Sequence, residues 1–239
     1  MREKSLKLGL RMNVKKTQTM VIRRNVEEEC KINIVVDGKI LEQVKSYIYL
    51  GQIITEDGKC EVEIRRRLEI ARSNFMNMKN LLTSRALHLN TRKKLIRCYI
   101  LSTLLYASET WAINQLMWNK IEAFEMWIWR RCLKISYTEH KTNVEVLQTV
   151  GEKRYLKKEI MKKKMQYFGH IVRKDGLQKK LLDAEVEGNR GRGRPITSWM
   201  GNISQWTGQS YKDLRSGAED RGCWRGVISR VLEEQDTIR

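Results

Sequence analysis

Three short stretches organise the N-terminal part of this chain: LGLRMNVKKT at residues 8–17, TMVI at 19–22 and YIYLGQII at 47–54. The short runs are rich in β-branched and aromatic residues and are bounded by Gly and Asp, a pattern that predicts strands. A polar gap separates the second run from the third, and we expect a small β element built from short strands.

Two Asp-Gly pairs mark the turns of this β element. Asp37-Gly38 stands between the apolar runs 34–36 and 40–41 and predicts a hairpin, because glycine accepts a positive φ at the turn. Asp57-Gly58 closes the following strand in the same way.

The remainder of the chain has the periodicity of helices. In residues 59–83, Ile64, Leu68, Phe75 and other apolar residues recur every three or four positions and share one face. Asn90 is a reasonable N-cap for a second helix, which is apolar nearly all round and is therefore expected to be buried. The predicted helices cover about 59–83, 90–111, 115–133, 142–151 and 153–172. The capping box Thr142-x-x-Glu145 starts the fourth of these, Thr197 or Ser198 and Ser210-x-x-Asp213 cap two shorter helices, and a last helix begins near Asp220. The predicted fold class is mainly α with a small N-terminal β element (α+β).

Aromatic residues gather around the third of these helices, at Trp111, Trp118, Trp127 and Trp129. Tryptophans interleaved with arginines can stack nucleic-acid bases. At helical spacing they are more often core residues, and we favour the core interpretation.

The charge of the chain points to a polyanionic partner. The 239 residues carry a formal net charge of +19, and 41% of them are hydrophobic, enough to build a core. Basic blocks at 1–24, 59–97 and 151–239 alternate with an acidic block at 25–58 and a neutral block at 98–150. Nucleic acid is the partner that this balance indicates most strongly. The alternative is a basic protein with solvated faces and no specific partner.

The cysteines give no sign of a disulfide framework or a zinc site. They are odd in number, widely separated and lack a Cys-x-x-Cys pair, and Cys132 with His140 supplies only two potential ligands. Reduced thiols and the absence of an apolar signal core lead us to expect an intracellular protein. Within the cell, we expect it in the nucleus. The cysteines are Cys30, Cys60, Cys98, Cys132 and Cys223.

The N-terminal segment also carries a family resemblance. Gly9-Leu10-x-x-Asn13-x-x-Lys16-Thr17, followed about thirty residues on by Tyr49-Leu50-Gly51, resembles the end of the palm of a reverse transcriptase encoded by non-LTR (LINE-like) retrotransposons. In that family the first piece is the fourth palm motif and the second is the primer-grip hairpin. The helices that follow resemble the thumb and the C-terminal tail, so the resemblance covers nearly the whole chain.

The resemblance implies a parent that performs RNA-templated DNA synthesis with Mg²⁺. Two-metal phosphoryl transfer needs clustered carboxylates, and the family's metal-binding Asp-Asp pair occurs nowhere in this sequence. We therefore expect a fragment that binds a template–primer duplex of RNA and DNA, has no cofactor of its own and does not polymerise alone. By resemblance, Lys16 matches the motif lysine proposed to protonate pyrophosphate, and Tyr49, Leu50 and Gly51 match the primer grip.

Basic residues on the predicted helices and in one Gly-Arg linker are the candidates for nucleic-acid contact. On a helix such residues are equally compatible with a solvated face, and the resemblance to a thumb favours the functional interpretation. Lysine suits phosphate contact without base readout, and alternating Gly and Arg can lay a flexible backbone along phosphates. The candidates are Arg65, Arg66, Arg72, Lys162, Lys163, Lys164, Arg190, Arg192 and Arg194.

The expected organisation has four parts: a palm edge with the primer-grip-like hairpin (1–58), a helical thumb-like domain (59–135), a basic helical connector (136–186), and a Gly/Arg linker with a helical tail (187–239). Two other functions stay open at this point. One is a non-enzymatic helical module that binds nucleic acid, and the other is an interaction protein whose basic faces meet acidic partners.

Overall fold

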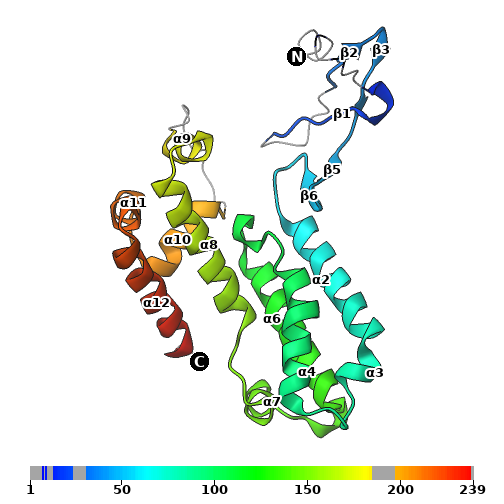
Figure 1. Cartoon of the computed structure of the whole chain (residues 1–239), viewed down its shortest axis with the longest axis vertical. Helices are drawn as coiled ribbons and strands as arrows, with labels where there is room; N and C mark the ends of the chain where they lie inside the picture. Colours follow the sequence, from blue (N-terminus) through cyan, green and yellow to red (C-terminus); the bar gives the residue numbers. More distant parts are fainter. Residues whose placement is uncertain (1–6, 8, 10–12, 24–30, 185–196, 238–239) are drawn as a thin grey trace. The chain divides into compact units, whose positions relative to one another are not determined.

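The computed structural model describes residues 7, 9, 13–23, 31–184 and 197–237. The chain divides into two compact units, Met1–Glu63 and Ile64–Arg239. The first holds short strands and the second is helical, so the predicted class, mainly α with a small N-terminal β element, is confirmed (Figure 1). The expected boundaries at 135/136 and 186/187 fall inside the second unit.

Three pairs of short strands make up the β structure of the first unit. A one-turn helix, η1 (Val14–Lys16), precedes them. The antiparallel hairpin of β5 and β6 is the longest pair and places Tyr47 opposite Ile54. The pairs are β1 (Gln18–Thr19) parallel to β4 (Glu42–Gln43), β2 (Val35–Val36) antiparallel to β3 (Lys39–Ile40), and β5 (Ser46–Tyr49) antiparallel to β6 (Gln52–Thr55).

Both hairpins close through two-residue turns with positive φ at each central residue. Asp37 and Gly38 have φ of 53° and 71°, which confirms the hairpin predicted from this pair. Leu50 and Gly51 have φ of 47° and 79°. Turns of this kind favour Asn-Gly or Asp-Gly, so Leu50 occupies a position that suits leucine poorly.

The first unit has little core of its own. Among its described residues, Leu41 is the one buried apolar side chain. Isolated two-stranded hairpins are marginally stable in water, because they have no second layer against which to bury a face. Many of its large apolar residues are exposed: Ile22, Ile32, Ile34, Val35, Ile40, Tyr47, Ile48, Tyr49 and Leu50.

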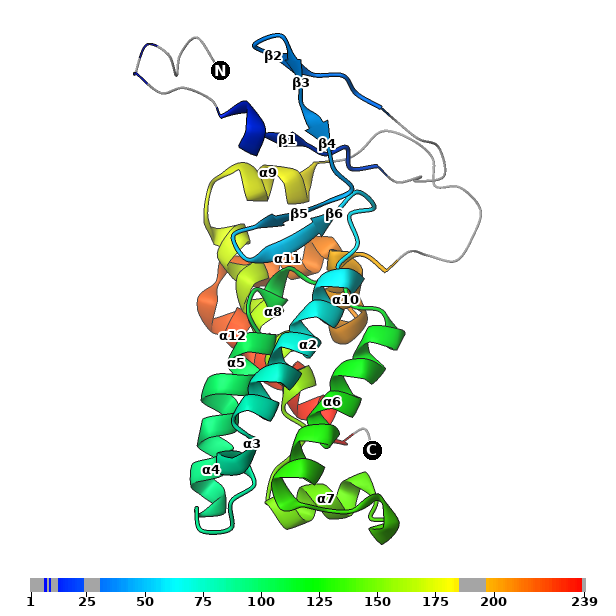
Figure 2. The same ribbon diagram turned by 90° about the vertical axis from the view of Figure 1, so that its right-hand side faces the viewer.

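The second unit begins with a group of helices that lie side by side, α2, α4 and α6, with α7 at one end of the group (Figures 1 and 2). The face of α2 predicted to be apolar, which includes Ile64, Leu68 and Phe75, is buried. The elements are α2 (Glu61–Asn77), α3 (Lys79–Leu82), α4 (Leu89–Leu95), η2 (Ile96–Leu101), α5 (Ser102–Leu104), η3 (Ser108–Thr110), α6 (Gln115–Leu133), η4 (Tyr137–Glu139) and α7 (Asn143–Val150).

A second group of helices packs around α8. Phe168 of α8 lies at its centre, with its ring centroid 5.3 Å from that of Trp224. Trp111, Trp118 and Trp129 are buried too, which confirms their interpretation as core residues, whereas Trp127 is only half-buried. The elements are α8 (Leu156–Arg173), α9 (Leu177–Asp183), α10 (Trp199–Thr207), α11 (Tyr211–Glu219) and α12 (Arg221–Thr237). No helix in the described parts of the chain has both the length and the apolarity to cross a bilayer.

The second predicted helix differs most from expectation. Its N-cap is His88, whose ring nitrogen accepts the N–H of Asn90, so Asn90 is not the cap. A π-helical stretch, η2, interrupts it, and the α5 segment ends at Leu104. A π-helical turn holds more residues than an α-helical turn and changes which side chains face inward. Tyr99, within η2, is exposed, and so is Tyr106, which lies beyond the end of α5. The prediction that this segment is apolar nearly all round and buried was therefore wrong.

Buried Glu125 sets the start of α8. Its carboxylate accepts the backbone N–H groups of Tyr155 at 2.7 Å and Leu156 at 3.4 Å, both at the N-terminus of this helix. This cap comes from a residue about thirty positions away, which is why the predicted start at Lys153 was too early. Burial raises the pKa of the Glu125 carboxyl, against the lowering effect of these two hydrogen bonds.

Candidate nucleic-acid interface

The basic residues predicted on α2 lie off the face that forms the core. Arg65 and Arg72 are exposed and Arg66 is half-buried. The Arg72 guanidinium is 3.1 Å from the Glu69 carboxylate and 5.3 Å from the centroid of the Trp127 ring. An exposed ion pair of this kind contributes little stability, so Arg72 can exchange Glu69 for another anion at small cost.

The lysine run on α8 does not form one surface. Lys162 is exposed, and Lys163 is half-buried and donates to the carbonyl of Leu105 at 3.1 Å. Lys164 is fully buried, which excludes it from phosphate contact and corrects its assignment to the interface. Successive side chains on a helix point about 100° apart, so three adjacent lysines cannot share one face.

Lys164 has a structural role. Its ammonium donates to the carbonyl of Trp111 at 2.8 Å and to the side-chain oxygen of Asn202 at 2.9 Å. It also lies 5.2 Å and 5.4 Å from the ring centroids of Trp199 and Trp206. Three of these four partners belong to α10, so the charge of Lys164 fastens α10 to α8.

The segment at Leu105 and Tyr106 connects the basic parts of α2 and α8. The Arg67 guanidinium of α2 stacks over the Tyr106 ring at 4.4 Å, while Lys163 of α8 bonds to the Leu105 carbonyl. Tyr106 remains exposed. Basic residues of the two helices therefore border the same stretch of backbone.

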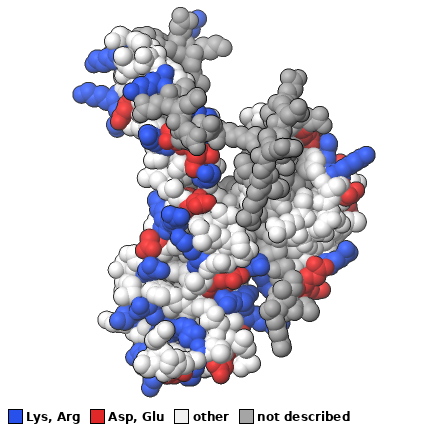
Figure 3. Space-filling view, turned by 180° about the vertical axis from the view of Figure 1, so that it is seen from behind, with Lys and Arg blue, Asp and Glu red and all other residues white. Residues whose placement is uncertain are grey.

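Several other basic residues hold the fold together. Arg92 is buried and donates to the carbonyl of Cys132 at 2.7 Å. Lys93 and Arg97 both pair with Glu152, at 3.0 Å and 2.7 Å. On the face drawn in Figure 3, Lys and Arg are spread over the visible described surface with Asp and Glu among them. The basic composition thus serves both packing and surface charge.

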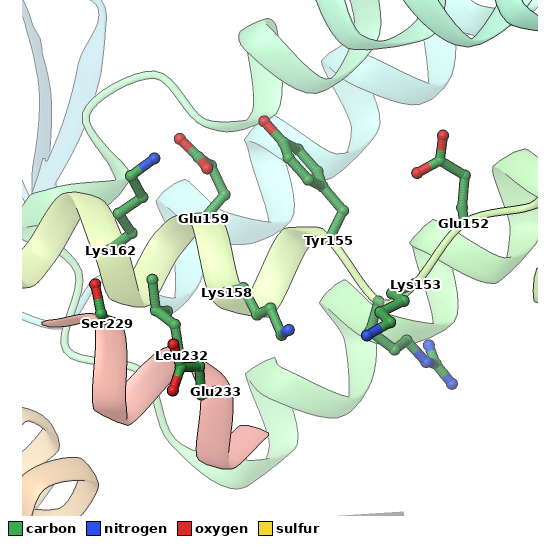
Figure 4. Close-up of a pocket in the computed structure, with 10 residues that line it drawn as sticks. Glu152, Lys153, Tyr155, Lys158, Glu159, Lys162, Ser229, Leu232 and Glu233 are labelled. Atoms are coloured by element: carbon green, nitrogen blue, oxygen red, sulfur yellow. The ribbon is translucent and has the colours of Figure 1, made fainter. Parts of the chain in front are cut away.

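A groove of about 440 Å³ lies at the start of α8 and the end of α12 (Figure 4). Lys153, Lys158 and Lys162 contribute positive charge to its lining. Glu152, Glu159 and Glu233 line it as well, so an anion entering it meets nearly balanced charge. This groove is a poor phosphate site despite its lysines.

In the first unit, the primer-grip-like residues Tyr49, Leu50 and Gly51 form the tip of the β5–β6 hairpin, and Leu50 is 75% exposed. The backbone N–H of Ile53 in this hairpin donates to the Glu63 carboxylate at 2.9 Å. Lys16 ends the one-turn helix η1 and is exposed.

The donor set needed by the Mg²⁺ of a polymerase is missing from the described residues. Nowhere among them do three His, Cys, Asp or Glu side chains gather closely enough to hold a metal ion. The described residues therefore do not fit a two-metal centre. Arg190, Arg192 and Arg194, the predicted contacts of the Gly-Arg linker, lie outside the described residues.

Sequence reasoning missed a second groove, of about 670 Å³, at the C-terminal end of α6. It combines aromatic and basic side chains from α6 and from the loop that contains η4. The capping box Ser136-x-x-Glu139 could have revealed an ordered turn here, because it has the same pattern as Thr142-x-x-Glu145, the predicted cap that the structure confirms. The lining residues are Trp127, Arg130, Arg131, Ile135, Ser136, Tyr137, His140 and Lys141.

The fold and the basic residues on its surface define a basic, mainly helical protein, whose described N-terminal part contains two hairpins. The chain is similar to an uncharacterised transposon-derived protein of Caenorhabditis elegans. The two are 26% identical over 245 positions, which cover 95% of this chain and 86% of that protein. No family model and no solved structure matches the chain. The similarity is compatible with a transposon origin.

Proposed function

We propose that this chain binds nucleic acid through the basic residues of α2 and the adjoining part of α8, as the palm-edge, thumb and tail portion of a retrotransposon reverse transcriptase. The observation that carries the proposal is the placement of Arg65, Arg66 and Arg72 on a long helix whose opposite face is core. Arg65 and Arg72 are seven positions apart and therefore share one exposed face, with Arg66 at its side. The helix holds these cations on a rigid element, which suits contact with a phosphate backbone. The similarity to a transposon-derived protein supports the same origin.

The strained hairpin tip supports the primer-grip part of this proposal. Leu50 combines a positive φ of 47° with 75% exposure of its side chain. Both features are unfavourable for leucine, and unfavourable backbone conformations occur most often at functional sites. In this proposal Tyr49, Leu50 and Gly51 position the end of a primer, and Lys16 acts only when a catalytic palm supplies the metal-binding carboxylates.

A salt titration of binding tests the proposal. The full chain is mixed with a fluorescent RNA–DNA duplex, and anisotropy is followed as the salt concentration rises. The variant R65A/R66A/R72A should bind more weakly. The slope of its log binding constant against log salt concentration should become shallower by up to about 0.9 for each lost phosphate contact. The variant K212A/R225A/R230A removes the same charge from exposed positions on α11 and α12 and is the matched control.

Equal losses in the two variants would show that only net charge matters and would reject the α2 interface. Primer extension on an RNA template with Mg²⁺ is run beside the titration. We expect binding without extension, because the sequence has no Asp-Asp pair. Extension by the purified chain would refute the expectation that it is inactive alone.

A further inference from the structure

We propose that the groove at the C-terminal end of α6 binds an unpaired nucleotide of a single-stranded nucleic acid. Its base would stack on Tyr137, and its phosphate would lie against Arg131 and Lys141. This inference rests on the proposed nucleic-acid binding and adds to it a site for single-stranded segments. The groove adjoins the α2 surface at Trp127, whose ring centroid lies 5.3 Å from the Arg72 guanidinium.

The first observation is the exposure of Tyr137. Its side chain is 91% exposed, the highest value among the large hydrophobic residues described, compared with 56% for Tyr99. A tyrosine ring left in water forgoes the favourable burial of a large apolar surface. A ring in this state offers an open face for stacking, and base stacking on such aromatic platforms tolerates any sequence.

The second observation is that the loop carrying Tyr137 is held in place. Ser136 and Glu139 form a capping box around η4, with the Ser136 N–H donating to the Glu139 carboxylate at 2.8 Å. The Arg130 guanidinium closes the loop by donating to the Lys141 carbonyl at 2.7 Å and to Asn143 at 3.1 Å. A platform fixed in this way loses little conformational freedom when a ligand binds.

The third observation is the charge of the lining. Three of its eight residues are cationic and none is acidic. The Arg131 guanidinium lies 4.6 Å from the centroid of the Trp127 ring, a cation–π contact that holds it against α6. Lys141 pairs with the nearby Glu139 carboxylate at 2.8 Å, and that carboxylate also accepts the Ser136 N–H. Because this ion pair is exposed, a phosphate can replace the carboxylate as the partner of Lys141 at small cost.

The end of α6 does not oppose an anion as strongly as a helix C-terminus usually does. Two of its terminal carbonyls accept N–H groups from the following turn, Arg130 from Ile135 at 2.9 Å and Arg131 from Lys134 at 3.1 Å. Paired carbonyls present less negative charge to a phosphate than open ones.

The size and chemistry of the groove favour a single strand over a duplex. A volume of about 670 Å³ lies within the range of sites that enclose small ligands, about 300–1,000 Å³. Stacking on Tyr137 requires a base with a free face, which duplex bases lack because they stack on one another. Another groove, of about 460 Å³, shares Trp127 and Arg130 with this one and continues along α6. A neighbouring nucleotide of the same strand therefore has a path beyond the Tyr137 site.

Parallel binding measurements with the full chain test the proposal. The ligands are a fluorescent oligothymidine and a blunt duplex of equal length. The Tyr137→Ala variant should lose about 5- to 150-fold in affinity for the single strand, the range expected for one base–aromatic stack, and should retain duplex binding. Tyr137→Phe keeps the ring and should bind as the wild type does. Tyr99→Ala removes another exposed tyrosine outside the groove and is the control.

Photocrosslinking supplies a second readout. An oligonucleotide containing 5-iodouracil should crosslink to the peptide that contains Tyr137, as identified by mass spectrometry. Crosslinks found only elsewhere would overturn the proposal, as would unchanged single-strand binding by Tyr137→Ala. Binding of a poly-glutamate peptide is measured as well. If the peptide binds as tightly as the oligothymidine, and Tyr137→Ala weakens both equally, the proposal is overturned in favour of an acidic protein partner.

The design separates this inference from the proposed function. If the wild type binds the duplex, and Tyr137→Ala changes neither the affinity for the duplex nor that for the single strand, the groove assignment fails and the α2 interface stands. If the wild type binds neither ligand at low salt, the proposed function fails and the groove assignment fails with it.

Discussion

Replacing Lys164 by methionine should destabilise the helical unit strongly. The substitution keeps a long, unbranched side chain and removes the ammonium, which donates to the Trp111 carbonyl at 2.8 Å and to Asn202 at 2.9 Å. The Trp111 carbonyl would lose this bond, whereas the Asn202 oxygen would keep the N–H of Ile113 at 2.9 Å. The lost anchor is the one that fastens α10 to α8.

The magnitude follows from opposing contributions. Hydrogen bonds from a charged group contribute about 1.5–3 kcal/mol each, and a desolvated cation over an aromatic ring contributes about 2 kcal/mol. Removing the charge also relieves its desolvation penalty, which amounts to several kcal/mol. We expect a net loss of about 2–4 kcal/mol in the free energy of unfolding, to which the Trp111 carbonyl left without its charged donor contributes most.

Urea and thermal unfolding followed by circular dichroism measure this loss. At about 2–4 °C per kcal/mol for a chain of this size, Tm should fall by about 10 °C. Lys162→Met removes an exposed charge two residues away and should stay within about 0.5 kcal/mol of the wild type. A Lys164→Met protein as stable as the wild type, or more stable, would refute the reasoning and show that the desolvation of Lys164 outweighs its contacts.

The remaining predictions concern local features of the fold. Gly169→Ala should cost about 1–3 kcal/mol in urea unfolding, because a Cβ there would lie 2.5 Å from the Trp224 ring; Gly217→Ala, in open space, should be neutral or stabilising. Glu125→Gln tests the raised pKa of this buried carboxyl. A raised pKa stabilises the wild type at low pH, and this stability is lost as the pH rises through the folded-state pKa. In denaturant titrations, the free energy of unfolding of the wild type relative to Glu125→Gln should therefore be higher near pH 4 than near pH 7. The same difference at both pH values would contradict the raised pKa. Leu50→Asn should stabilise the β5–β6 hairpin by about 1 kcal/mol, seen as about fivefold slower amide exchange in these strands, because asparagine tolerates the positive φ of 47°.

Local patterns in the sequence were sufficient for much of the fold. The Asp37-Gly38 hairpin, the helix Gln115–Leu133 and the capping box Thr142-x-x-Glu145 were predicted with correct positions. Each depends on contacts between residues a few positions apart, such as a turn that requires a positive φ or a cap three residues from its partner. Periodic apolar residues likewise identified the inner face of α2.

The candidate site was less predictable, because it depends on contacts between distant residues. The run at 162–164 reads as one basic patch, but the partners of Lys164 lie 53 and 38 residues away, and only the packing of α10 makes this lysine a buried anchor. The same limit applies to Arg92, whose partner Cys132 is 40 residues away.

The amino-acid sequence by itself determined the helical class, the turns, most of the caps and the strong positive charge of this protein, since these follow from local geometry and from composition. The tertiary structure decided which charges serve the core and which serve the surface, and it placed Trp127, Arg131 and Tyr137 around one groove. The physical reason is that burial and long-range pairing depend on which helix faces meet, and one-dimensional periodicity does not specify that.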